Sequence, residues 1–254
     1  MIQSLAARVC MGVAAVTLAG CATDEIRSPD AGTRMRVAAA AEANGQNDIA
    51  LSMYGAAAAR DPDNAEAQAR FAMVLLRTGN RPQAERVLAA AIERRPSDRR
   101  LAVMLGRLRL QNGAAGEALS LFDRVLASDS RNVDALDGRG VALDLMGRHP
   151  EAQESYRRAQ ALSPESISVA NNLGLSLLLD GRPDEARAVL EPLARRSDAP
   201  QRVTANYAIS LAATGDEAAA RAVLGEGSGD LRALADTLRV NRQVIEVTPT
   251  DGRS

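Results

Sequence analysis

The sequence contains no tryptophan and no lysine, only one histidine (His149), and two cysteines (Cys10 and Cys21). Only 2% of its 254 residues are aromatic, although 46% are nominally hydrophobic. Such a composition favours closely packed helices rather than a thick globular core. A phosphate-binding P-loop needs a lysine, and a zinc site needs several histidine or cysteine ligands. We therefore expect no cofactor and no metal, and we expect His149 to be an exposed turn residue.

Charge and motifs point away from catalysis. The 31 basic residues, all arginine, nearly balance the 32 acidic ones, so the chain lacks the basic footprint of a nucleic-acid-binding protein. The serine-nucleophile motif G-x-S-x-G does not occur. Paired carboxylates such as Asp184 and Glu185 fall in a polar turn, and no nucleophile, base and stabilising group can be assembled. The sequence predicts a protein that is not an enzyme and that takes neither nucleic acid nor a small-molecule substrate.

Residues 1–20 have the pattern of a signal peptide. Arg8 precedes an apolar run over residues 9–19 that is too short for a stable transmembrane helix. The run ends in Leu-Ala-Gly-Cys at residues 18–21, which resembles the lipobox of bacterial lipoproteins. The resemblance implies cleavage before Cys21 and acylation of Cys21, palmitate included, so that the acyl chains anchor the protein in a membrane. An ordinary signal peptide that happens to contain a cysteine is the alternative.

The residue after Cys21 bears on which membrane holds the anchor. It is Ala22, whereas in the lipoprotein family an aspartate at this position tends to retain a protein in the inner membrane. By that resemblance we expect the periplasmic face of the outer membrane of a Gram-negative bacterium, although Asp24 leaves inner-membrane retention open. Residues 21–33 are then the lipidated cysteine and a flexible polar tether.

A repeat of 34 residues runs through most of the chain. It consists of a glycine, an alanine five residues later and a large residue four residues after that: Gly45, Gly79, Gly113, Gly147, Gly181 and Gly215; Ala50, Ala84, Ala118, Ala152, Ala186 and Ala220; Tyr54, Leu88, Phe122, Tyr156, Leu190 and Leu224. The glycine suits a tight turn, the small residue lets two helices touch, and the large one fills the space between units. The pattern resembles the tetratricopeptide repeat, a helix–turn–helix unit.

The resemblance implies an all-α, right-handed superhelical solenoid of about six tetratricopeptide repeats over residues 34–224. The units span residues 31–64, 65–98, 99–132, 133–166, 167–200 and 201–234, the last only to about Leu224. Arg109 falls in a slot that holds leucine in four other units, and Arg139 takes an apolar slot. Residues 225–245 are expected to form a linker and a C-terminal capping helix, and residues 246–254 a disordered tail.

In the tetratricopeptide family, the first helix of each unit lines a concave groove that binds peptides or helices. The resemblance places the following residues on that face: Met73, Leu76, Arg100, Arg107, Asp137, Val141, Asp144, Asn171, Asn172, Leu175, Leu178, Asn206 and Ile209. The predicted face is zoned by charge. Arg100 and Arg107, two helical turns apart, give a basic zone on the third unit, and Asp134, Asp137 and Asp144 give an acidic zone on the fourth. The alternative is a solvated face.

Further along the predicted face, Leu175, Leu178 and Ile209 give an apolar floor. Asn172 and Asn206 occupy equivalent positions in neighbouring units. A carboxamide both donates and accepts hydrogen bonds, so these asparagines can pair with a peptide backbone, as such residues do in peptide-binding members of the family. Alternatively, the asparagines cap turns or face water, and the apolar residues are covered by a neighbouring unit or by the C-terminal helix.

Residues 138–224 resemble the TadD lipoproteins of the Tad (Flp pilus) secretion system. A lipobox followed by six repeats also resembles the pilotins of type IV pili. These resemblances imply a non-catalytic protein-binding scaffold, lipid-anchored in the outer membrane, that assists Tad/Flp pilus biogenesis with a secretin or another pilus or envelope assembly component as partner. The open alternatives are an adaptor that docks murein hydrolases or synthases, a type IV pilus secretin pilotin, a self-associating structural protein, and an envelope hydrolase.

Overall fold

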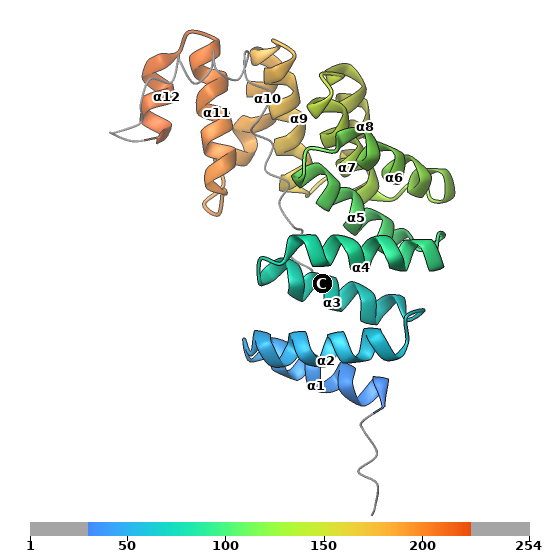
Figure 1. Cartoon of the computed structure of the whole chain (residues 1–254). Coiled ribbons are helices and arrows are strands. Elements are labelled where there is room, and N and C mark those ends of the chain that lie inside the picture. The colour runs from blue at the N-terminus through green and yellow to red at the C-terminus, as the bar shows by residue number, and fades with distance from the viewer. Residues whose placement is uncertain (1–29, 225–254) are drawn as a thin grey trace, which may run out of the picture.

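The computed structural model of the chain describes residues 30–224. The helices in this range are α1 (Ala31–Ala43), α2 (Asn47–Arg60), α3 (Ala65–Arg77), α4 (Arg81–Arg94), α5 (Arg99–Gln111), α6 (Ala115–Ser128), α7 (Val133–Leu145), α8 (His149–Leu162), α9 (Ile167–Leu179), α10 (Pro183–Ala194), α11 (Gln201–Ala213) and α12 (Glu217–Leu224). Consecutive helices pack against each other, and the pairs stack along a curved path (Figure 1). The chain is therefore an all-α repeat solenoid, as the sequence predicts. The expected signal peptide, Cys21 and capping helix lie outside the described residues.

Side-chain caps start the first helix of the first five units. The capping side chains, each of which accepts the backbone N–H three residues ahead, are Asp30, Asn64, Asp98, Asn132 and Ser166. Such caps satisfy amide groups that have no partner in the first turn of a helix. Because Asp30 accepts the N–H of Thr33 at 2.6 Å, α1 begins at Ala31, inside the segment expected to be a tether up to residue 33.

Each helix pair turns at the repeat glycine. The φ angles there are 70° at Gly45, 82° at Gly79, 77° at Gly113, 74° at Gly147, 76° at Gly181 and 92° at Gly215. A Cβ atom disfavours this left-handed geometry, so glycine is the residue that suits it. Regular spacing of the glycines therefore determines where the chain reverses, and with it the length of both helices of a unit.

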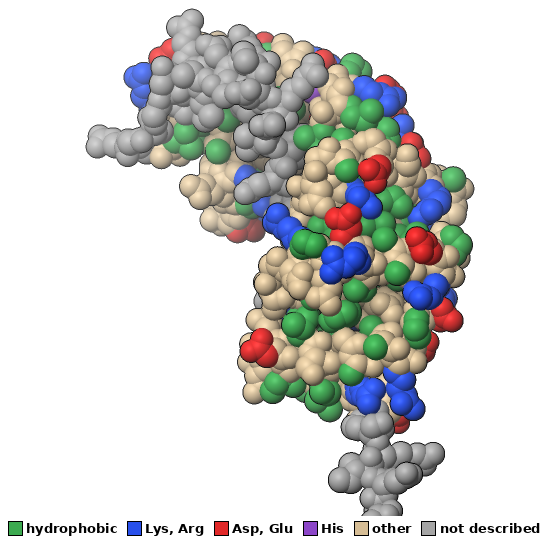
Figure 2. Space-filling view, viewed as in Figure 1, with side chains coloured by type: hydrophobic (Ala, Val, Ile, Leu, Met, Phe, Trp, Pro, Cys, Tyr) green, Lys and Arg blue, Asp and Glu red, His purple; other side chains and the backbone are tan. Residues whose placement is uncertain are grey.

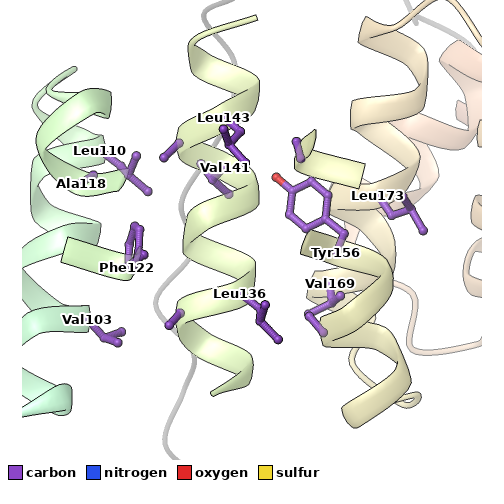
Figure 3. Close-up of a cluster of buried hydrophobic side chains, with 14 of the residues drawn as sticks. Val103, Leu110, Ala118, Phe122, Leu136, Val141, Leu143, Tyr156, Val169 and Leu173 are labelled. Atoms are coloured by element: carbon purple, nitrogen blue, oxygen red, sulfur yellow. The ribbon is translucent and has the colours of Figure 1, made fainter. Parts of the chain in front are cut away.

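The large repeat residue fills the space between neighbouring units. The residues at this position that are at most 1% exposed are Tyr54, Leu88, Phe122, Tyr156 and Leu190. Phe122 lies between the helices of the third unit and α7 of the fourth (Figure 3). A Cβ atom on Gly106 or Gly138 would come within 2.7 or 2.4 Å of its ring. Glycines on both sides thus make room for an aromatic ring in a closely packed interior.

Two arginines that interrupt the apolar repeat have partners at unit boundaries. Arg109 Nη1 lies 2.6 Å from a carboxylate oxygen of Glu85 in the preceding unit. Arg139 donates to Ser155 Oγ at 2.6 Å and to Asp123 Oδ1 at 2.8 Å. A half-buried guanidinium needs such partners, because burying an unpaired charge is costly. The two departures from the repeat pattern therefore replace apolar packing by hydrogen-bonded contacts.

The first helices of the units lie on the inside of the curve. From α3 to α11, each first helix contacts the first helix of the next unit, whereas no two second helices make a comparable contact. A stack whose first helices are closer together than its second helices bends toward the first helices. The side of the first helices that faces away from the second helices forms a concave surface on the inside of the curve (Figure 1). We call this surface the inner face, and α3, α5, α7, α9 and α11 line it.

Candidate protein-interaction face

Charged side chains on the inner face pair across unit boundaries. Arg107 Nη2 lies 2.7 Å from Asp134 Oδ1 of the next unit, and Arg100 pairs with Glu66 of the preceding unit. Arg100 and Arg107 of α5 are therefore each paired with an acid of α3 or α7. The expected separation into a basic and an acidic zone does not hold, because opposite charges on adjacent helices bind each other. Acidic and basic side chains are also interspersed over the face in view in Figure 2.

Two asparagines of the inner face donate hydrogen bonds to the first helix of the preceding unit. Asn172 Nδ2 donates to Asp137 Oδ1 at 2.9 Å, and Asn206 Nδ2 donates to Asn171 Oδ1 at 2.9 Å. Each bond joins residues 35 positions apart, so the same contact recurs from one unit to the next. Neither asparagine caps a turn through these amide groups. Contact between them and a partner peptide stays a prediction.

The carboxylate of Asp137 is partly buried, and one of its two oxygens accepts a hydrogen bond from another residue in the range 30–224. It is half-buried, and burial raises its pKa above the ordinary 3.8, against the hydrogen bond from Asn172 and the charge of Arg107. The bond from Asn172 reaches Oδ1. No buried polar side-chain atom within residues 30–224 lacks a partner, and no hydrogen bond there reaches Oδ2 of Asp137. The Oδ2 atom is therefore not fully enclosed.

Asp144, which was predicted to face a partner, lies inside the fold and is 2% exposed. Its carboxylate accepts hydrogen bonds from Tyr156 Oη at 3.0 Å and from Ser176 Oγ at 2.7 Å. His149 Nδ1 donates to Oδ1 at 2.8 Å. Burial raises the pKa of Asp144, against the bonds from His149, Ser176 and Tyr156. Asp144 therefore joins α7 to α8 and α9 and is not a groove residue.

His149 also differs from the sequence-based expectation of an exposed turn residue. It is the first residue of α8, and its side chain is only 12% exposed. His149 lies two residues after the repeat glycine Gly147, and its imidazole turns inward toward Asp144, whose buried carboxylate needs donors. The single histidine is therefore part of an internal hydrogen-bond cluster.

The sequence carries a signal for this cluster that sequence reasoning missed. The residues at positions 12 and 24 of each unit are, in order, Glu42 and Tyr54, Leu76 and Leu88, Leu110 and Phe122, Asp144 and Tyr156, Leu178 and Leu190, and Ala212 and Leu224. An acid thus occurs at position 12 only where position 24 is tyrosine. The hydroxyl of Tyr54 donates to Glu42 at 2.8 Å, which repeats the contact of the fourth unit. A buried tyrosine hydroxyl needs an acceptor, and the acid supplies it.

Most apolar residues predicted for the face are buried. Met73 is 37% exposed and Leu76 is half-buried. The remaining four are Val141 (2% exposed), Leu175 (8%), Leu178 (6%) and Ile209 (5%). Val141, Leu178 and Ile209 belong to the hydrophobic cluster that runs through the stack. The expected apolar floor is therefore not an open strip in this structure, because little of these four side chains is exposed.

The groups that the inner face presents suit hydrogen bonding and ion pairing. They are carboxylates, carboxamides and guanidinium groups held at unit boundaries, and such groups recognise polar parts of another polypeptide. Within residues 30–224, no group of three or more His, Cys, Asp or Glu residues is arranged to hold a metal ion. No helix of this range is long and apolar enough to cross a membrane.

Known proteins share the fold and part of the sequence. The uncharacterized protein y4yS of Sinorhizobium fredii is 34% identical over 85 residues, which are 34% of this chain and 47% of that protein. The match therefore spans about half of that relative's length. PilW, a widely conserved type IV pilus biogenesis factor, has a TM-score of 0.72 at 17% identity over 80% of this chain and 97% of PilW. PilF of Pseudomonas aeruginosa has a TM-score of 0.66 at 16% identity over 81% of this chain and 96% of its own.

Profiles of the tetratricopeptide repeat match most of the chain. One matches residues 41–108, and a second matches residues 103–167, 139–200 and 171–229 in overlapping segments. The matched segments contain the repeat glycines, the helices α2 to α12 and the buried large residues described above. The low identity to the solved structures shows the fold alone, whereas the profile matches show the family. The chain belongs to the tetratricopeptide-repeat family.

Proposed function

We propose that the protein is a lipid-anchored, non-catalytic scaffold that assists Tad/Flp pilus biogenesis by holding a partner protein on its inner face. The observation that carries the proposal is the match of the repeat stack to nearly the whole of PilW, a type IV pilus biogenesis factor. The resemblance of residues 138–224 to TadD lipoproteins and the lipobox ending at Cys21 add to it. The partner is a secretin subunit or another component of pilus assembly.

The anchor and the scaffold act together in this proposal. Acyl chains on Cys21 hold the repeat stack at the periplasmic face of the outer membrane, joined to it by a short polar segment. A secretin segment captured on the inner face is then confined to the same surface. Confinement raises its effective concentration there and favours assembly of the secretin ring.

Replacement of Cys21 tests the anchor in cells that make Flp pili. We expect Cys21→Ala to reduce secretin multimers on immunoblots and to abolish pili, because the scaffold is no longer held at the membrane. Cys10→Ala, which changes a cysteine in the apolar run of the signal peptide, is the matched control and should leave both unchanged. Normal multimers and pili in the Cys21→Ala strain would contradict the proposed anchor.

Crosslinking in intact cells tests the partner. Mass spectrometry of the captured proteins should identify a secretin or another pilus component. The double replacement Asn172→Ala and Asn206→Ala should weaken that capture while circular dichroism shows the helices to be retained. Capture of murein hydrolases or synthases instead would replace the pilus role by the adaptor role.

A further inference from the structure

Asp137 differs from its neighbour Asp134 on α7 in forming no ion pair with any residue in the range 30–224. Asp134 is paired with Arg107 at 2.7 Å. Asp137 receives the amide of Asn172, and none of the ion pairs among residues 30–224 includes it. Asp137 is therefore a carboxylate of α7 that forms no ion pair within residues 30–224, although the charge of Arg107 is near enough to act on its pKa.

The bond from Asn172 determines which atoms surround this carboxylate. A carboxylate only accepts hydrogen bonds, so the NH₂ group of Asn172 must point toward Asp137, and its carbonyl Oδ1 remains as an acceptor. Asn206 repeats the arrangement on α11, where its NH₂ group donates to Asn171. Asp137 Oδ2 and the two asparagine carbonyl oxygens are thus acceptors on three successive first helices. We call Asp137, Asn172 and Asn206 the acceptor strip.

The apolar neighbours of the acceptor strip contribute little exposed surface. Leu175 and Leu178 lie on the next two turns of α9 after Asn172 and are 8% and 6% exposed. A partner that covered this part of the inner face would gain little from apolar burial. Recognition here therefore depends on hydrogen bonds and charge, and the strip offers oxygen acceptors and one net negative group.

We propose that the acceptor strip binds a cationic side chain, an arginine or a lysine, in a partner segment that lies across α7, α9 and α11. The inference rests on the proposed function and deepens it by naming the chemistry of the captured segment. A guanidinium carries five N–H donors in a planar fork, so it can reach the carboxylate and a neighbouring carbonyl together. Charge-assisted hydrogen bonds of this kind are stronger where water is partly excluded.

The surroundings of Asp137 agree with a binding role. Burial raises its pKa, which means that the charged carboxylate is held at a cost in the absence of a partner. A bound cation would offset that cost. Carboxylates whose charged form is destabilised by burial are typical of binding and catalytic sites. Proteins keep such groups for their function although they lower the stability of the fold.

A pair of synthetic peptides tests the proposal with the full chain purified in detergent. One is an acetylated, amidated alanine–valine peptide with a single central arginine, and the other carries glutamine in place of the arginine. Isothermal titration should show the arginine peptide binding about tenfold more tightly, as expected for one charge-assisted contact. Asp137→Asn should remove that preference, because asparagine keeps the shape and loses the charge.

Asp184→Asn is the matched control. It removes the same charge from an exposed position on α10, and the tenfold preference should persist. A wild-type chain that binds the two peptides equally or binds neither would overturn the proposal, as would an unchanged preference in Asp137→Asn.

Two other outcomes would assign the acceptor strip to a different occupant and overturn the partner proposal. The first is a preference that appears only after residues 225–254 are deleted, which would assign it to the chain's own C-terminal segment. The second is a dimer, seen by light scattering, that dissociates on Asp137→Asn, which would assign it to a second copy. The Cys21→Ala experiment is independent of both, so failure of this inference can be told from failure of the proposed function.

Discussion

The hydroxyl of Tyr156 donates a 3.0 Å hydrogen bond to Asp144 in the interior of the fourth unit. In the first unit, Tyr54 makes the equivalent bond to Glu42 at 2.8 Å. Acid and tyrosine are 12 residues apart in both, so each bond joins the two helices of one unit. Burial raises the pKa of Tyr54 to about 12 and that of Tyr156 well above its ordinary value, so both hydroxyls remain donors near neutral pH.

Removal of the Tyr156 hydroxyl should destabilise the protein more than removal of the Tyr54 hydroxyl. Tyr156→Phe deprives a buried carboxylate of a donor, at a cost of about 1–3 kcal/mol in the free energy of unfolding. Glu42 is closer to solvent and keeps its contact with Arg77 at 2.9 Å, so Tyr54→Phe should cost less. Urea unfolding of both variants measures the difference. Equal losses would contradict the greater importance of the buried pair.

Replacement of both members of the Asp144–Tyr156 pair should cost less than the two single replacements added together. Asp144→Leu alone leaves the tyrosine hydroxyl without its acceptor. Asp144→Leu with Tyr156→Phe recreates the apolar pair that Leu110 and Phe122 form in the third unit. The interaction energy from the double-mutant cycle should be about 0.5–3 kcal/mol. Strict additivity in urea unfolding would show that the two side chains do not stabilise each other.

Alanine should be harmful at Gly138 and helpful at Gly116, although both glycines lie in helices. A Cβ atom on Gly138 would come within 2.4 Å of the Phe122 ring, so Gly138→Ala should cost about 1–3 kcal/mol of stability. Nothing lies within 4 Å of a Cβ atom on Gly116, and Gly116→Ala should stabilise by about 0.4–1 kcal/mol. Thermal unfolding gives both values. As a further check, Phe122→Leu should reduce the cost of Gly138→Ala by making room for the new methyl group.

Asp137→Asn should change how stability depends on pH. Burial raises the pKa of Asp137 above the ordinary 3.8. As pH rises above that value, the unfolded chain loses the proton before the native chain does, so the free energy of unfolding falls through this window. Asparagine removes that loss, and the variant should therefore gain stability relative to wild type as the pH rises from about 3.5 to 7. Urea unfolding across this range measures it, and a constant difference between the two proteins would contradict the raised pKa.

The architecture follows from features that act over a few residues. A glycine at each 34-residue interval sets the turn, as the φ angle of 74° at Gly147 shows. Side-chain caps such as Asn132 begin the helices, and small residues such as Gly140 admit the large residue of the same unit, Tyr156. Each of these effects depends on neighbours in the sequence, so fold class, unit number and turn positions could all be predicted.

The contacts of the inner face could not be predicted in the same way. The repeat position correctly identified the helices that line it, but it did not show which side chains bind one another. Arg107 and Asp134 are 27 residues apart, and Asn172 and Asp137 are 35 apart. Whether two such residues touch depends on how adjacent units are rotated and spaced, and that is a property of the packed stack.

Asp137 and Asp144 show the limit of what helix periodicity in the sequence can predict. They are seven residues apart on α7, close to two helical turns, so periodicity predicts that both point the same way. Asp144 instead meets Tyr156 of α8 and Ser176 of α9 and is enclosed, whereas Asp137 meets Asn172 and is only partly buried. The sequence by itself determined the solenoid, because turns, caps and helix periodicity are local. Only the tertiary structure decided which of the two carboxylates is internal, because burial depends on the side chains that neighbouring helices bring to each position.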